Sequence, residues 1–181
     1  MKRNEVRIVA GVWRSRRIRF PSRDDLRPSP DRVRETLFNW LGQDLTGYEC
    51  LDLFAGSGAL GFEAASRGAR RVVMVEHGRA AYAALEENRA ALDARQVELA
   101  RRDALEFVRT DRSQYDVIFL DPPFSASWAE KLPALLEPRL AREGRVYYES
   151  AAGMQWPPGW EVMKQGHAGQ VVFQLVARHT P

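Results

Sequence analysis

The stretch LDLFAGSGALG, residues 51–61, decides the predicted fold of this chain. It places an apolar run directly before Gly56-Ser57-Gly58 and an apolar segment directly after it. This order predicts a buried strand, a tight glycine turn and a helix, as in sheets that bind nucleotide-like ligands. Glycine suits the turn because it permits sharp backbone angles and close approach to a ligand. The G-x-G-x-x-G spacing alone is a weak signal, and a purely structural turn is the alternative.

Strands and helices are predicted to alternate around this turn. The predicted strands lie at 49–54, 70–76, 96–100, 115–121 and 145–149. The predicted helices lie at 31–41, 59–67, 79–92, 104–110 and 128–140. Residues 160–165 and 170–177 indicate a closing hairpin. We therefore expect an α/β, Rossmann-like fold with a mostly parallel seven-stranded sheet, an antiparallel edge hairpin, and helices on both faces.

The N-terminal thirty residues form a distinct basic segment in this interpretation. Apolar residues alternate on both sides of a basic turn, so residues 5–20 predict a hairpin. Prolines and charges predict a loop that follows it. Asp31, or Ser29 followed by Pro30, is the predicted N-cap of the first helix. We therefore divide the chain into a hairpin and loop at 1–30 and an α/β domain at 31–181.

The charge of the chain is unevenly distributed. Residues 1–34 hold eleven Lys or Arg and four Asp or Glu, whereas the rest of the chain has a formal charge of −4. A basic segment on a mildly acidic body suggests a polyanion as partner. Arginine outnumbers lysine 24 to 3 over the whole chain, so part of the arginine content of this segment reflects a general preference for arginine over lysine. The alternative is a hairpin whose arginines are only solvated. The candidate phosphate contacts here are Arg14, Arg16, Arg17 and Arg27.

Other classes of protein are disfavoured by composition. A single cysteine, Cys50, permits no disulfide within the chain, and with three histidines it makes a dedicated metal site unexpected. No apolar run of eighteen residues predicts a membrane span, and the N-terminal sequence lacks the pattern of a secretory signal. We therefore expect a cytoplasmic protein without a metal, and a monomer.

Two acidic residues near the glycine turn bear on the class of ligand. Asp52 precedes Gly56 by four residues, where a carboxylate can reach the amino group of a methionine moiety. A dinucleotide has no ammonium group at that place. Glu76 ends the second strand, where a carboxylate can accept two hydrogen bonds from a ribose diol. A solvated charge at the end of a strand is the alternative for Glu76, but the pattern favours S-adenosylmethionine.

A third acidic residue, Asp103, precedes the helix predicted at 104–110. Its carboxylate can accept from an adenine amino group or cap the helix, and the two roles are compatible. The candidate cofactor-binding residues are Asp52, Phe54, Gly56, Ser57, Gly58, Glu76, His77, Asp103 and Ala104.

The most informative motif is Asp121-Pro122-Pro123-Phe124, which directly follows the apolar run YDVIFL. Two prolines fix the backbone and remove two N–H donors, so the motif presents only acceptors. Such a site suits an NH2 group, and the aromatic ring can stack on a planar base. Acceptors on both N–H bonds would aim the lone pair of an exocyclic amine at a sulfonium methyl group. The alternative is a proline-rich strand end with a buried phenylalanine.

Three runs of this sequence resemble the RsmD family of bacterial 16S ribosomal RNA guanine-N2 methyltransferases: LRPSPDRVRETLFNWL, LDLFAGSGALGFEAASRGA and YDVIFLDPPF. The resemblance implies S-adenosylmethionine as donor and, as substrate, a small-subunit assembly particle that already carries ribosomal proteins. It implies that Asp121, Pro122 and Phe124 form the catalytic set. Ser29 stands where the family more often has threonine, and we place Ser29 and Arg34 with the substrate-binding residues.

Three other functions compete with this interpretation. A DNA or RNA adenine-N6 methyltransferase would use the same four-residue motif, although the chain has no room for a separate base-reading domain. An NAD(P)-dependent oxidoreductase explains the glycines and Glu76 but gives the motif at Asp121 no role. A catalytically silent RNA-binding scaffold would keep the fold, and the intact Asp52 and Asp121 argue against it.

Overall fold

The computed structural model describes residues 3–22, 28–122 and 131–179. Its centre is a seven-stranded sheet in the order β5-β4-β3-β6-β7-β9-β8, in which β5, β4, β3, β6 and β7 pair in parallel. β9 runs antiparallel to both of its neighbours, β7 and β8. The strands are β3 (Glu49–Asp52), β4 (Arg71–Val75), β5 (Val97–Ala100), β6 (Tyr115–Leu120), β7 (Leu140–Ser150), β8 (Trp160–Ala168) and β9 (Val171–Arg178). The predicted mostly parallel sheet with an antiparallel edge hairpin is confirmed.

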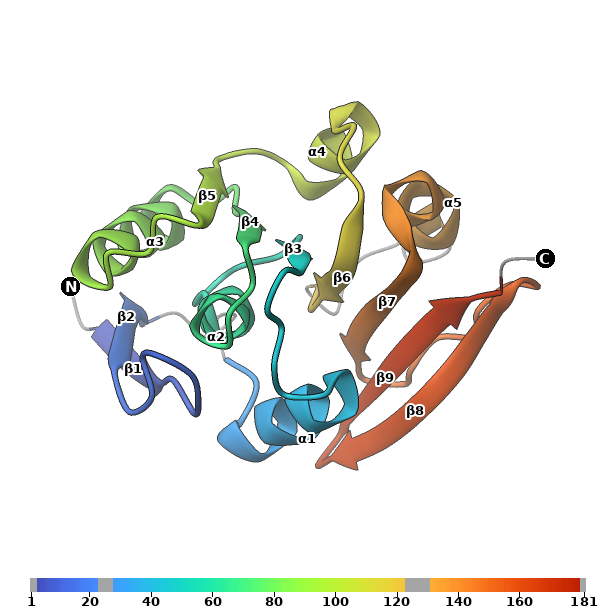
Figure 1. The fold of residues 1–181 in the computed structure, drawn as a ribbon, viewed down its shortest axis with the longest axis horizontal. Coiled ribbons are helices and arrows are strands. Elements are labelled where there is room, and N and C mark those ends of the chain that lie inside the picture. Colours follow the sequence, from blue (N-terminus) through green and yellow to red (C-terminus); the bar gives the residue numbers. More distant parts are fainter. Residues whose placement is uncertain (1–2, 23–27, 123–130, 180–181) are drawn as a thin grey trace.

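Helices cover both faces of this sheet (Figure 1). The helices are α1 (Asp31–Leu41), α2 (Ala59–Ser66), α3 (Arg79–Ala91), α4 (Ala104–Thr110) and α5 (Leu132–Leu136). Side chains of α1, α2 and α3 share one hydrophobic cluster with one face of the strands, including Phe38, Phe62 and Leu85. Side chains of α4 and α5 share a second cluster with the other face, including Val108 and Leu136. The two cores follow from the two-residue alternation of strand side chains.

The predicted N-terminal hairpin is present as β1 (Arg3–Arg7) and β2 (Arg17–Pro21), which pair antiparallel. Its apolar side chains Val6, Ile8, Ile18 and Phe20 belong to the same hydrophobic cluster as α1, α2 and α3. In Figure 1 the hairpin lies beside α2 and α3. The hairpin is thus packed onto the body of the protein through its apolar face, which leaves its arginines outside.

Three local predictions are wrong. The expected helix at 128–140 is, within the described residues, the short α5 and a 3-10 helix at Glu137–Arg139, because Pro138 cannot donate a helical hydrogen bond. β7 begins earlier than residue 145 and leaves its register with β6 between Tyr115 and Val117. The N-cap of α1 is Pro30, and neither Ser29 nor Asp31 caps the helix with its side chain. Asp31 instead accepts from Arg34 at 2.5 Å.

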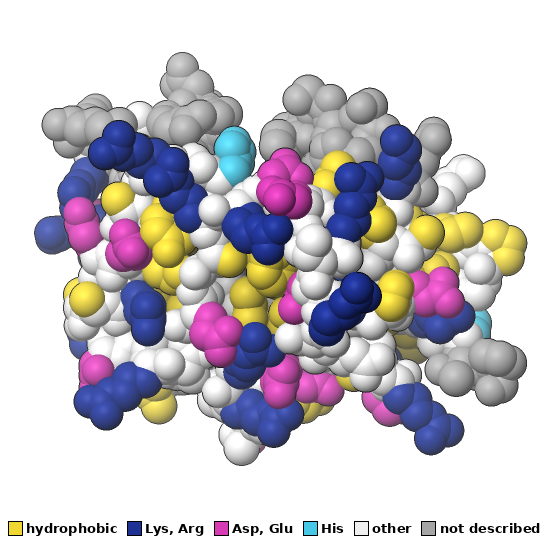
Figure 2. Space-filling model, turned by 90° about the horizontal axis from the view of Figure 1, so that it is seen from above, with side chains coloured by type: hydrophobic (Ala, Val, Ile, Leu, Met, Phe, Trp, Pro, Cys, Tyr) yellow, Lys and Arg dark blue, Asp and Glu magenta, His cyan; other side chains and the backbone are white. Residues whose placement is uncertain are grey.

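The surface on the side of α4 and α5 is of mixed charge (Figure 2). Lys and Arg side chains are spread over this view and lie among Asp, Glu and hydrophobic side chains. No helix in the described part of the chain has the length and hydropathy needed to span a bilayer.

Candidate functional site

The glycine turn between β3 and α2 has the geometry that its sequence predicts. Gly56 and Gly58 adopt φ angles of 51° and 84°, which favour glycine over residues with a side chain. A Cβ atom on Gly58 would lie 2.7 Å from side-chain atoms of Leu85 and Phe62. A Cβ atom on Gly61 would lie 2.9 Å from Met74 on β4, so this glycine lets α2 pack closely on the sheet. The turn therefore packs its backbone closely against α2, α3 and β4 at the carboxyl edge of the sheet.

Asp52, at the end of β3, is 2% exposed and holds the first turn of α2. Its carboxylate accepts from the backbone N–H of Gly61 at 3.0 Å. Burial raises the pKa of Asp52 to about 7. The hydrogen bond from the Gly61 N–H lowers this pKa, whereas the charge of Glu76 raises it. No Lys or Arg within the described ranges pairs with Asp52. A cationic ligand would relieve this buried charge, as the predicted methionine ammonium group would do.

Glu76 follows β4 and supports the same turn from the other side. One carboxylate oxygen accepts from the N–H of Gly56 at 3.0 Å, and the other accepts from the N–H of Gly78 at 2.6 Å. His77 beside it is exposed, with Nδ1 3.6 Å from the Glu76 carboxylate. Glu76 is therefore not a freely solvated charge, and its contact with a ribose stays a prediction.

The remaining predicted cofactor residues lie near the same edge of the sheet. Asp103 caps α4, because its carboxylate accepts from the N–H of Glu106 at 2.9 Å, which confirms one of its two expected roles. Phe54 and Ala104 are partly buried and pack against the second hydrophobic cluster. Ser57 is buried, and its hydroxyl accepts from the N–H of Ala59 at 3.3 Å. The adenine contact of Asp103 stays a prediction.

Asp121 follows β6 and lies among other carboxylates. Burial raises its pKa well above the ordinary range, and the charges of Glu149 and Asp52 raise it further. Pro122 is buried. Pro123 and Phe124 lie outside the described residues. Within the described ranges no group of three or more His, Cys, Asp or Glu is placed to hold a metal ion.

The sequence did not single out Glu149, the carboxylate beside Asp121. Glu149 lies near the end of β7 and is 6% exposed. It accepts from the hydroxyl of Ser29 at 2.7 Å and from the hydroxyl of Tyr147. A sequence signal was present, because the predicted strand 145–149 ends in a carboxylate near the same sheet edge as Asp121. That signal becomes specific only when β6 and β7 are known to be neighbours.

The predicted substrate-binding residues fall into two groups. Arg14, Arg16 and Arg17 are exposed on the hairpin, where Arg16 donates to the carbonyl of Ala91 at 3.0 Å and Arg17 pairs with Glu5 at 3.3 Å. Arg27 lies outside the described residues. Ser29 and Arg34 are buried, at 5% and 1% exposure.

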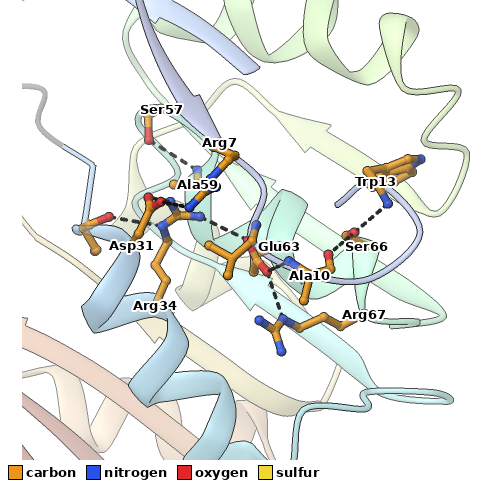
Figure 3. A network of polar contacts seen from close by, with 12 residues as sticks. Arg7, Ala10, Trp13, Asp31, Arg34, Ser57, Ala59, Glu63, Ser66 and Arg67 are labelled. Atoms are coloured by element: carbon orange, nitrogen blue, oxygen red, sulfur yellow. Dashed lines mark hydrogen bonds and ion pairs between the residues drawn. The ribbon is translucent and has the colours of Figure 1, made fainter. Parts of the chain in front are cut away.

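Arg34, which was predicted to bind substrate, lies in the interior of the protein and contacts buried groups there. Its guanidinium donates to Glu63 at 3.1 Å and to the carbonyl of Ser29 at 3.1 Å. Glu63 is fully buried, and it also accepts from Arg67 at 2.9 Å and from the backbone N–H groups of Val9 and Ala10 (Figure 3). Arg34 therefore belongs to a polar network that joins α1, α2 and the N-terminal hairpin.

Comparisons with known proteins agree with this fold. A family model described as conserved hypothetical protein 95 matches residues 6–177. The ribosomal RNA small subunit methyltransferase D of Escherichia coli strain K12 is 40% identical over 96% of this chain and 90% of its own length. The chain belongs to the RsmD family. Its similarity to the Haemophilus influenzae methyltransferase of the same name is 39% identity over 96% of this chain and 94% of that protein.

The solved structure of yhhF from Escherichia coli has the same fold as this RsmD-family chain. It superposes with a TM-score of 0.88 at 38% identity and covers 98% of this chain and 100% of that one. The protein is thus a methyltransferase with the Rossmann-like fold of S-adenosylmethionine-dependent enzymes. The fold and the family names together imply S-adenosylmethionine as the cofactor.

Proposed function

We propose that the protein transfers a methyl group from S-adenosylmethionine to the exocyclic N2 amine of a guanine in 16S ribosomal RNA. The names of the Escherichia coli and Haemophilus influenzae relatives support small-subunit RNA as the substrate. The observation that carries the proposal is Asp121, a partly buried acceptor at the carboxyl end of β6 beside the buried carboxylate of Glu149. Pro122 and Pro123 follow it and have no N–H to donate, so this edge suits a ligand that brings its own N–H donors.

The residues around the glycine turn fit S-adenosylmethionine. The left-handed turn at Gly56 and Gly58 brings backbone to the ligand, and Asp52 lies beneath it without a cationic partner among the described residues. Glu76 would accept from the ribose hydroxyls and Asp103 from the adenine amino group. The bound cofactor would supply an electrophilic methyl group on a sulfonium, whose C–S bond breaks as the new C–N bond forms.

Asp121 has two tasks in this reaction. It accepts an N–H of the amine and so holds the nitrogen lone pair toward the methyl group, a positioning effect worth several kcal/mol and up to about 7–11 in ideal cases. It can also receive the proton that the methylated amine releases, because burial and the neighbouring carboxylates raise its pKa. Phe124 would stack on the base.

The basic N-terminal segment would hold the RNA in this proposal. Residues 1–30 contact RNA and residues 31–181 carry the chemistry. Arg14, Arg16, Arg17 and Arg27 contact phosphates, while the guanine swings out of its stack to reach the sheet edge. The substrate is a cytoplasmic small-subunit assembly particle that carries ribosomal proteins, and the protein acts as a monomer.

Methyl transfer to small-subunit particles tests this proposal. Particles from cells that lack the modification are incubated with the protein and with S-adenosylmethionine that carries a labelled methyl group. The digested RNA is then analysed for the modified nucleoside. We expect N2-methylguanosine at a single position. Label in N6-methyladenosine would support the adenine enzyme instead, and a folded protein that binds S-adenosylmethionine but transfers no methyl group to particles or free RNA would contradict the proposal.

A further inference from the structure

The carboxyl group of Glu149 lies beside that of Asp121, and the proposed reaction does not use it. β6 and β7 are parallel neighbours, with Leu120 opposite Tyr148, so Asp121 and Glu149 are the next residues along the two strands. Side chains alternate along a strand, which places Glu149 on the same face as Tyr147. The charge of Glu149 also raises the pKa of Asp121, as expected for two carboxyl groups that lie close together.

The hydrogen bonds that the described residues make to Glu149 reach only one of its two oxygens. The hydroxyl of Ser29 and the hydroxyl of Tyr147 both donate to Oε1. No donor within residues 3–22, 28–122 and 131–179 pairs with Oε2. Two hydroxyl donors fix the carboxylate through one oxygen and leave the other as an acceptor beside Asp121.

We propose that Glu149 selects guanine, by accepting the N1–H of the base at Oε2 while Asp121 accepts an N–H of the 2-amino group. This inference rests on the proposed function. On the edge of guanine the N1–H and the 2-amino group are neighbouring donors, and they match two neighbouring acceptors. On adenine the 6-amino group lies beside N1, whose lone pair would face the carboxylate and be repelled.

This arrangement also accounts for a buried Glu149 beside a partly buried Asp121, neither of which has a cation as partner among the described residues. A buried acceptor without a donor is unfavourable, and a base that brings two N–H groups supplies the missing donors. A site built to hydrogen-bond a substrate N–H rejects an analogue that lacks it far more strongly than an apolar pocket could. The alternative is that Glu149 only anchors Ser29 and Tyr147, a role that affects folding but not the choice of base.

The test uses the full chain and small-subunit particles reconstituted with 16S RNA in which the modified guanosine is replaced by 2-aminopurine riboside. This analogue keeps the 2-amino group but has a lone pair at N1. We expect the wild-type kcat/KM for guanosine to exceed that for 2-aminopurine by at least about a hundredfold. If the wild-type protein has nearly the same kcat/KM for guanosine and 2-aminopurine, the proposal is contradicted, and no variant is needed for this result.

The variant Glu149→Gln sharpens the test. Its amide oxygen can keep the hydrogen bonds from Ser29 and Tyr147, which would put its NH2 donor where Oε2 was. We expect its kcat/KM for guanosine to fall by at least about tenfold and its preference over 2-aminopurine to shrink by a similar factor or reverse. Glu143→Gln, an exposed change on the same strand, should keep the wild-type preference. An equal loss of kcat/KM on both substrates in Glu149→Gln would make the role of Glu149 structural and overturn the proposal. Absence of guanine methylation by the wild-type protein would instead overturn the proposed function itself.

Discussion

Two regions of this molecule bury carboxylates in opposite ways. Glu63 is fully buried, and its partners among the described residues are the guanidinium groups of Arg34 and Arg67 and the backbone N–H groups of Val9 and Ala10. At the sheet edge, Asp121 and Glu149 have no Lys or Arg partner in the described part of the chain. Burial raises the pKa of both of these carboxyl groups.

The presence or absence of a cationic partner distinguishes a carboxylate with a structural role from one that can bind a ligand. A buried carboxylate whose charge is compensated holds elements together, and breaking its pairs leaves uncompensated charge in the interior. A buried carboxylate without a cation keeps its acceptors for a ligand, and strongly perturbed pKa values gather at functional sites for this reason. The two regions should therefore respond differently to mutation.

The largest effect is expected for Glu63→Gln. The change removes the charge that compensates Arg34 and Arg67, so the free energy of unfolding should fall by about 3–5 kcal/mol. Urea denaturation followed by circular dichroism measures this loss. Glu5→Gln, which breaks exposed pairs with Arg17 and Arg19, should leave the midpoint nearly unchanged. Equal small effects in the two variants would show that the Glu63 network does not hold the hairpin to the body.

Asp121→Ala should act on turnover instead. We expect methyl transfer to fall by at least about a hundredfold, because acceptor positioning acts mainly on the transition state. The dissociation constant for S-adenosylmethionine should stay near the wild-type value. Single-turnover kinetics and calorimetric titration on the same preparation measure the two quantities. Near-wild-type turnover of Asp121→Ala would contradict the role of Asp121 in orienting the amine.

Glu76→Ala should weaken cofactor binding. Loss of charged hydrogen bonds to the ribose should weaken S-adenosylmethionine binding by about 1.5–3 kcal/mol. Calorimetric titration gives this value, and Glu86→Ala on the exposed side of α3 is the matched control. An unchanged dissociation constant in a folded Glu76→Ala protein would restrict Glu76 to holding the backbone of Gly56 and Gly78.

The smallest effect on the protein itself is expected for the double change Arg16→Ala and Arg17→Ala. Both side chains are exposed, so melting temperature and cofactor affinity should hardly move. Binding to small-subunit particles should weaken, and each lost phosphate contact should reduce the salt slope by about 0.7–0.9. Changing the exposed Arg109 and Arg142 to alanine should leave the slope unchanged. Wild-type binding and slope in the hairpin variant would mean that the RNA is held elsewhere.

The parts of the fold that depend on local pattern could be predicted from sequence. The turn at Gly56 and Gly58 and the strand that ends before Asp121 follow from glycine chemistry and apolar periodicity within a few residues. The helix at 104–110 and its cap at Asp103 follow from the same kind of signal, and the structure has them at the predicted positions. Short-range rules suffice where the cause of a feature is itself short-range.

The parts that depend on pairing between distant segments could not be predicted. The Ser29–Glu149 hydrogen bond joins residues 120 positions apart, and Glu63 meets Val9 across 54 positions. Arg34 was predicted to bind substrate because the sequence gives no sign of the buried carboxylate of Glu63 that it contacts. A sequence pattern predicts that charged residues of an amphipathic segment are exposed to solvent, unless a buried partner is known.

The most direct test of this account compares Glu63→Gln and Asp121→Ala in one experiment. Turnover per folded molecule on small-subunit particles is measured at a temperature where urea titration shows both variants to be folded, at saturating particle and S-adenosylmethionine. We predict that Glu63→Gln keeps near-wild-type turnover despite its lower stability, while Asp121→Ala loses at least about a hundredfold in turnover without losing stability. Similar turnover in the two variants would contradict the separation of a structural from a functional carboxylate cluster.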